Sequence, residues 1–177
     1  MIGPKTAEFR TKHARLRTWL KSEENLSLEP YLDSERKWTV GWGHLITDPV
    51  DLDRCRRGLK HLAALPNEEA AERLLDQDMQ IAVNDFELLF SSVEMSEARR
   101  DALTAMLYQM GMGRFRTFDK MIGAVYRRDW ERVYLEALDS DWGRKHKKRA
   151  ARTAAMLRGG TYAPDFAADA SGHAARA

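Results

Sequence analysis

The stretch Glu24-Asn-Leu-Ser-Leu-Glu-Pro-Tyr-Leu-Asp33-Ser-Glu-Arg-Lys-Trp-Thr39-Val-Gly-Trp-Gly-His44 changes its hydrophobic period, and this change decides the fold class. Residues 28–32 form a short apolar run, residues 33–37 have the composition of a turn, and residues 38–43 alternate between large and small side chains. Alternation with a period of two is typical of strands, so the stretch predicts a β-hairpin or a small sheet.

Asp33 and Thr39 lie on opposite arms of this predicted hairpin. Asp33 stands where the turn begins and Thr39 on the returning strand, so chain reversal brings the two residues near each other. The alternation places Thr39 on the opposite face from Trp38 and Trp42. Core packing is therefore favoured over sugar stacking for the two tryptophans.

Upstream of the hairpin, residues 7–24 predict an amphipathic helix. Its apolar positions follow helical spacing: Phe9, Leu16, Trp19 and Leu20. One further step of four residues reaches Glu24, so this carboxyl prolongs the apolar stripe, and burial raises the pKa of a carboxyl group. Glu23 lies four residues after Trp19, and periodicity leaves it open as the alternative.

Two carboxyl groups in unlike surroundings are what glycoside hydrolysis requires. One stays protonated to donate to the leaving oxygen, and the other stays ionised to activate water or stabilise positive charge. Glu24 and Asp33 are the candidates for this pair of roles.

Downstream, Asn67 is the predicted N-cap of a long helix over residues 67–90. Its stripe comprises Ala71, Leu75, Asp78, Met79, Ala82, Phe86, Leu89 and Phe90. A carboxylate on an apolar stripe requires a partner, and we expect a buried pair between Asp78 and His44 that serves structure and not catalysis.

The remaining sequence predicts helices and a tail. A short polar helix is expected over residues 51–61. We expect one helix that is capped by Ser96 and stopped by Gly111, and two more that are capped by Thr117 and Asp129. A basic helix over residues 144–157 should end at Gly159 and Gly160. Residues 167–177 are expected to form a flexible tail.

Composition narrows the class of protein. The 177 residues carry a net charge of +2, which does not indicate a nucleic-acid partner. The single Cys55 cannot form an internal disulfide, and no metal or cofactor is expected because no ligand cluster has metal-site spacing. We expect no secretory signal, because the first ten residues contain no apolar h-region, and no membrane-spanning segment, because no run of 18 apolar residues occurs. The basic block over residues 144–149 is either a solvated helix face or a weak contact with anionic envelope polymers.

The ordered motifs resemble those of the phage-type lysozymes, glycoside hydrolase family 24. Glu24, Asp33 and Thr39 fit the pattern of Glu, eight residues, Asp or Cys, five residues, Thr, and the run from Thr39 to Thr47 resembles the Thr-x-Gly-x-Gly-His signature. The similarity continues downstream in Asp76-Gln-Asp78, Arg99 to Leu103, Gln109 to Gly111, Trp142 with Arg149, and Gly159 to Tyr162. It covers roughly residues 10–163.

This resemblance implies roles for particular residues. Glu24 would be the general acid, Asp33 the carboxylate that positions or activates water, and Thr39 a second holder of that water. The bond cleaved would be the β-1,4 link between N-acetylmuramic acid and N-acetylglucosamine in peptidoglycan, with inversion. Sugar-contacting positions would be Leu45, Tyr108, Phe118 and Glu136, while Gln109 and Trp142 would line the far lobe of the cleft.

The expected architecture is α+β, mainly helical and two-lobed, with a lysozyme domain over residues 1–166. A small lobe would span about residues 24–66 and a helical lobe about 90–163, joined by the helix 67–90. The expected role is that of a monomeric endolysin, held in the host cytoplasm until a holin admits it to the cell wall. The alternatives are a tail-associated virion lysozyme and a catalytically dead peptidoglycan-binding module.

Overall fold

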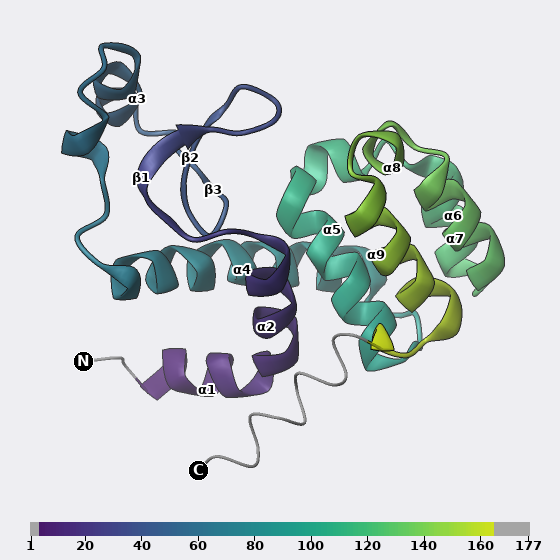
Figure 1. The fold of residues 1–177 in the computed structure, drawn as a ribbon. Coiled ribbons are helices and arrows are strands. Elements are labelled where there is room, and N and C mark those ends of the chain that lie inside the picture. The colour runs from purple at the N-terminus through teal and green to yellow at the C-terminus, as the bar shows by residue number, and fades with distance from the viewer. Residues whose placement is uncertain (1–3, 165–177) are drawn as a thin grey trace. The chain divides into compact units, whose positions relative to one another are not determined.

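The computed structural model describes residues 4–164, and the chain divides into two compact units, Met1–Gln80 and Ile81–Ala177 (Figure 1). The boundary falls inside helix α4 (Glu68–Phe90). The predicted mainly helical α+β fold is confirmed, with a three-stranded antiparallel sheet in the first unit. The tail expected over residues 167–177 lies outside the described residues.

Two helices, α1 (Pro4–Lys12) and α2 (Ala14–Glu23), stand where one helix over residues 7–24 was predicted. The chain breaks at His13, whose φ and ψ are −111° and 26°, and Figure 1 shows the sharp change of direction. The predicted stripe has a gap of seven residues between Phe9 and Leu16, so no buried apolar side chain holds a straight helix there. The single-helix prediction is therefore wrong at this point.

The predicted hairpin is a sheet of β1 (Ser27–Leu32), β2 (Trp38–Gly41) and β3 (His44–Leu45). Thr39 pairs with Tyr31 on one side and with Leu45 on the other. Val40 is buried with Ile46 and Cys55, and Trp38 packs against this cluster, so Thr39 lies on the other face as predicted. Trp42 follows the end of β2 and lies in the turn to β3, so the alternation does not extend to it.

The polar helix predicted over residues 51–61 is shorter and divided. Helix α3 (Pro49–Arg56) begins at Asp48, whose carboxylate accepts from the N–H groups of Val50 and Asp51. Gly58, with a φ of +79°, turns the chain into the 3-10 helix η1 (Lys60–Ala63). The left-handed backbone that glycine permits ends the α-helix before residue 61.

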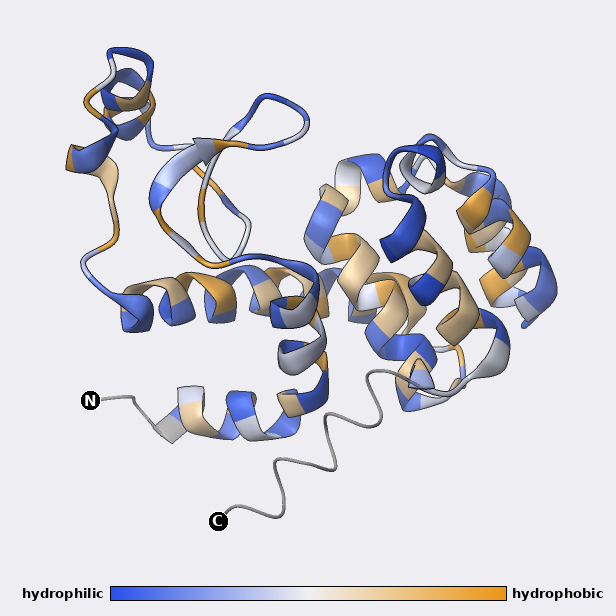
Figure 2. Ribbon diagram, in the orientation of Figure 1, coloured by the Kyte–Doolittle hydropathy of each residue, from blue (hydrophilic) through white to orange (hydrophobic). Residues whose placement is uncertain are grey.

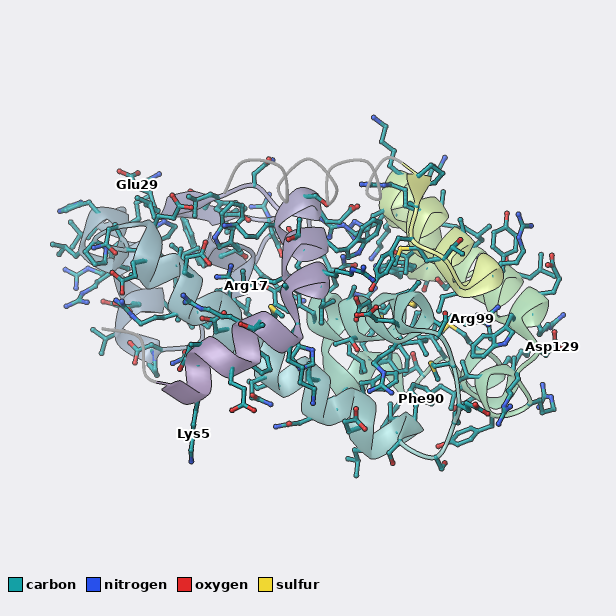
Figure 3. All side chains as sticks on the ribbon, turned by 90° about the horizontal axis from the view of Figure 1, so that it is seen from below. Lys5, Arg17, Glu29, Phe90, Arg99 and Asp129 are labelled. Atoms are coloured by element: carbon teal, nitrogen blue, oxygen red, sulfur yellow. The ribbon has the colours of Figure 1, made fainter. Side chains whose placement is uncertain are left out.

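Helix α4 begins as predicted, because the Asn67 side chain accepts from the N–H of Ala70 at 3.0 Å. Figure 2 shows the apolar residues that recur along α4, and those that are buried are Ala70, Ala71, Leu75, Met79, Ala82, Phe86 and Phe90. The buried carboxylate of α4 is Asp76, whose side chain is 9% exposed, whereas the side chain of Asp78 is 26% exposed. Asp76 accepts from Arg10 Nε at 2.6 Å and from Arg17 Nε at 3.1 Å (Arg17 is labelled in Figure 3).

As far as residue 164, the second unit consists of the end of α4 and five further helices. These are α5 (Glu97–Phe115), α6 (Asp119–Tyr126), α7 (Trp130–Leu138), α8 (Asp141–Lys145) and α9 (Lys147–Gly159). Helix α7 packs against α6 and α9, and α5 packs against α9. The rings of Phe86, Phe90 and Phe115 form a chain of aromatic contacts in the core.

Most of the predicted helix limits in this unit are confirmed. Ser96 caps α5 and Asp129 caps α7 through side-chain oxygens that accept backbone N–H groups. Gly111 interrupts α5 at a φ of 71°, although helical structure resumes and ends at Phe115. Gly160, at a φ of 70°, caps α9. The left-handed backbone suits glycine at both of these positions.

Two predictions for this unit are wrong. Thr117 does not cap α6; its hydroxyl donates to the carbonyl of Arg114, and Phe118 holds the N-cap position. The basic helix predicted over residues 144–157 is divided at His146, with φ and ψ of −115° and 50°. Within residues 4–164 no helix combines the length and apolar character needed to cross a membrane.

Candidate active site

The carboxyl group of Glu24 lies against the backbone of Gly43. Glu24 follows the last residue of α2, where its N–H still donates to the carbonyl of Leu20 while its own backbone is extended. Gly43 has a φ of +86°, and a Cβ built on it would lie 3.4 Å from Cδ and 3.5 Å from Oε2 of Glu24. Both Glu23 and Glu24 are partly buried, so burial does not separate them, but the contact with Gly43 distinguishes Glu24.

Asp33 is held by the turn that it begins. Its Oδ1 accepts from the N–H groups of Glu35 and Lys37, both at 2.8 Å, and its own N–H donates to the carbonyl of Lys37 at 2.9 Å. An aspartate that bonds to nearby backbone in this way fixes the turn and its own orientation. Within residues 4–164 no group hydrogen-bonds to Oδ2, so this oxygen can accept a bond from water.

Thr39 reaches the same peptide group as Asp33. Its hydroxyl donates to the carbonyl of Lys37 at 3.2 Å, and the residue is only 4% exposed. The structure therefore brings Asp33 and Thr39 together through Lys37, as the hairpin predicted. A hydroxyl that donates one bond retains lone pairs that can accept another.

His44 and Asp78 form the predicted pair but are not buried. Nδ1 of His44 lies 2.8 Å from Oδ2 of Asp78, which joins β3 to α4. The two side chains are 28% and 26% exposed, so the expected burial is wrong. Asp78 lies at the edge of the apolar stripe, and the adjacent Leu45 on β3 is also exposed.

Lys21 and Trp42 form a contact beside Glu24 that the sequence analysis did not identify. Lys21 Nζ lies 4.5 Å from the centre of the Trp42 ring and 2.5 Å from Oε1 of Glu72 on α4. Burial lowers the pKa of Lys21, and the nearby charge of Arg17 lowers it further. Lys21 lies one helical turn before Glu24, and Trp42 lies one residue before Gly43. These two positions in the sequence were the signal that could have identified the contact.

The second unit contains an open cavity of about 420 Å³, lined by two of the predicted sugar-contacting residues, Phe118 and Glu136, and by Trp142, which was predicted to line the cleft. Phe118 stacks on Phe115 with ring centres 6.2 Å apart, and Glu136 forms an ion pair with Arg132. Both polar and aromatic groups thus line a concave surface, as in small-molecule sites.

Trp142 contributes to a wall of this cavity. It is 3% exposed, and its Nε1 donates to Oε1 of Gln109 at 3.1 Å. Gln109 and Tyr108 lie on α5 before the interruption at Gly111, and both are partly buried. Trp142 therefore has little ring surface available for stacking on a sugar.

Charged residues line one side of the cavity. Arg144 Nη2 donates to Asp141 at 2.6 Å, and this hydrogen bond and charge hold the pKa of Asp141 below its ordinary range. Among the residues from 4 to 164, no cluster of three or more His, Cys, Asp or Glu is arranged to hold a metal ion.

Comparison with known proteins places the chain in a family. The phage lysozyme family model matches residues 21–156. Probable T4-type lysozyme 2 of Dictyostelium discoideum is 27% identical, over 82% of this chain and 95% of that protein. The pre-baseplate central spike protein Gp5 of Enterobacteria phage T4 is 31% identical over 78% of this chain but only 26% of its own length. The endolysin of Bacillus phage B103 is 30% identical over 53% of this chain and 32% of its own. The chain therefore belongs to the phage lysozyme family, and it is a glycoside hydrolase that acts on peptidoglycan.

Proposed function

We propose that this enzyme cleaves the β-1,4 bond between N-acetylmuramic acid and N-acetylglucosamine by direct attack of water, with inversion. Glu24 donates its proton to the leaving glycosidic oxygen. Asp33 accepts a proton from the water that attacks the anomeric carbon, and Thr39 binds the same water. The proton given up by Glu24 is thus balanced by the proton that Asp33 receives.

The observation that carries this proposal is the contact of Gly43 with the Glu24 carboxyl. A residue without a side chain brings the backbone against one face of the acid, which shields that face from water. Asp33 is in a different setting, because two backbone N–H groups occupy Oδ1 and Oδ2 stays accessible. Two carboxyl groups in such unlike settings suit the acid and base roles.

We further propose that Leu45, Tyr108, Phe118 and Glu136 contact the glycan, and that Gln109 and Trp142 line and support the binding surface. The His44–Asp78 pair is proposed to be structural, since its hydrogen bond joins two elements of the first unit. The basic block over residues 144–149 is proposed to make weak contact with anionic envelope polymers.

The proposed biological role is that of an endolysin, acting as a monomer on the cell wall after a holin has opened the inner membrane. Similarity to the endolysin of Bacillus phage B103 supports this role. Similarity to the T4 central spike protein favours a second candidate, a lysozyme carried in the virion and used at entry. Mass spectrometry of purified particles separates the two, because an endolysin is absent from them.

The experiment that tests the chemistry compares Glu24→Gln with Glu23→Gln in a turbidity assay on permeabilised Gram-negative cells. We expect Glu24→Gln to abolish clearing, since an amide cannot donate the proton, and Glu23→Gln to retain it. Clearing by Glu24→Gln together with its loss in Glu23→Gln refutes the assignment. Proton NMR of the first product identifies the anomer, and a product that retains configuration refutes inversion.

A further inference from the structure

The turn between β2 and β3 makes two contacts just before Gly43, one at Gly41 and one at Trp42. Gly41, at a φ of +67°, approaches α4 so closely that a Cβ there would lie 3.4 Å from the Cβ of Ala71. Trp42 lies under the ammonium group of Lys21, at 4.5 Å from the ring centre. An ammonium group at this distance from an indole ring is attracted by the ring quadrupole.

Lys21 also contacts α4 through two glutamates. Its Nζ lies 2.5 Å from Oε1 of Glu72 and 3.8 Å from Oε1 of Glu68. Glu72 also forms an ion pair with Arg17. Its side chain is 27% exposed, and burial lowers its pKa, so the cation is kept in a partly desolvated place. Desolvation strengthens a cation–π contact. It also raises the free-energy cost of leaving the cation without that contact.

Lys21 lies in the last turn of α2, and Glu24 is the residue that directly follows this helix. The N–H of Glu24 still donates to the carbonyl of Leu20, so the start of the extended segment is tied to the last turn of the helix. The contact of Lys21 with Trp42 therefore links the last turn of α2, directly before the acid, to the residue directly before Gly43, which lies against the carboxyl of Glu24.

We propose that Lys21 is a positioning residue for the hydrolytic reaction, which holds the Glu24 carboxyl against Gly43 through its contact with Trp42. This inference rests on the proposed role of Glu24 as the acid. In this role Lys21 does not contact the substrate. Its effect falls on the chemical step, because a displaced acid donates its proton less well while sugar binding elsewhere is unchanged.

The test measures kcat and KM on soluble peptidoglycan fragments by the release of reducing ends. Lys21→Met keeps the length of the side chain and removes its charge, and we expect kcat to fall about tenfold or more with KM within about twofold, as for a misplaced catalytic group. Lys21→Arg, which can also stack on an indole ring, recovers most of this loss. Arg73→Met is the matched control, since Arg73 also pairs with a glutamate of α4, Glu69, but is exposed.

A double-mutant cycle with Trp42→Leu tests whether the effect passes through this contact. Losses that act through one contact do not multiply, so the double variant should be about as active as either single variant. The Trp42→Leu variant also tests the proposal if Lys21→Met fails to fold. Wild-type kcat in folded Lys21→Met, a change in KM alone, or multiplied losses in the double variant each overturn it. An active Glu24→Gln enzyme overturns the proposed function instead, so the two failures are distinguishable.

Discussion

Replacement of Gly43 by alanine should reduce activity far more than it reduces stability. The left-handed backbone at a φ of +86° costs a residue with a Cβ about 1–2 kcal/mol. A protein of this size loses about 2–4 °C of melting temperature per kcal/mol, so we expect a fall of about 2–8 °C. The new methyl group would also lie 3.4 Å from Cδ of Glu24, in contact with the carboxyl.

Gly58 provides the matched control. Its φ is +79°, close to that of Gly43, and a Cβ there would meet nothing within 4 Å. Gly58→Ala should therefore show a similar fall in melting temperature with activity unchanged. Gly43→Ala should lose about tenfold or more in kcat/KM, because displacement of a catalytic group by about 1 Å can cost about a hundredfold.

Differential scanning calorimetry and the reducing-end assay, run at a temperature where both variants are folded, measure the two effects separately. Equal activity in the two variants would refute the reasoning, since it would mean that the approach of Gly43 to Glu24 has no catalytic consequence. A much larger loss of stability in Gly43→Ala alone would instead show that the turn is strained by the methyl group.

Two further predictions concern groups outside the acid's immediate surroundings. Asp76→Asn removes a nearly buried carboxylate from two arginines whose side chains are 20% and 18% exposed, and we expect a loss of about 2–4 kcal/mol in urea unfolding. Asp78→Asn should cost only about 1 kcal/mol and spare activity, because its pair with His44 is partly solvated; equal losses at the two positions would contradict this order. Burial raises the pKa of Cys55, with Asp51 adding to the effect, so at pH 8.5 the folded protein should resist a disulfide reagent and label only as it unfolds. Rapid labelling of the folded protein would be the contrary result.

Local signals predicted much of the fold because they act over a few residues. The period change after Glu24 indicated the sheet, and the caps at Asn67, Ser96 and Asp129 were confirmed since each depends on one side chain and a backbone N–H nearby. The break at His13 was not predicted, although the gap between Phe9 and Leu16 in the apolar stripe was the signal for it.

Long-range packing decided the rest. Asp76 and Asp78 lie on either side of the same apolar stripe, and the carboxylate that is buried is the one that meets arginines some sixty residues earlier in the chain. Sequence periodicity cannot show which of the two carboxylates is buried, because burial depends on these distant arginines. For the same reason Glu23 and Glu24 could not be separated by phase, and the contact of Lys21 with Trp42 was not foreseen.

The turn aspartate also has an evolutionary consequence. Because Oδ1 of Asp33 closes the turn by accepting two backbone N–H groups, the residue serves folding as well as its proposed chemistry. A lineage that abandoned catalysis would still be selected to keep an aspartate or asparagine here, since both side chains can close such a turn. Retention of this residue in a relative is therefore weak evidence of activity, and the acid at the end of α2 is the more informative position.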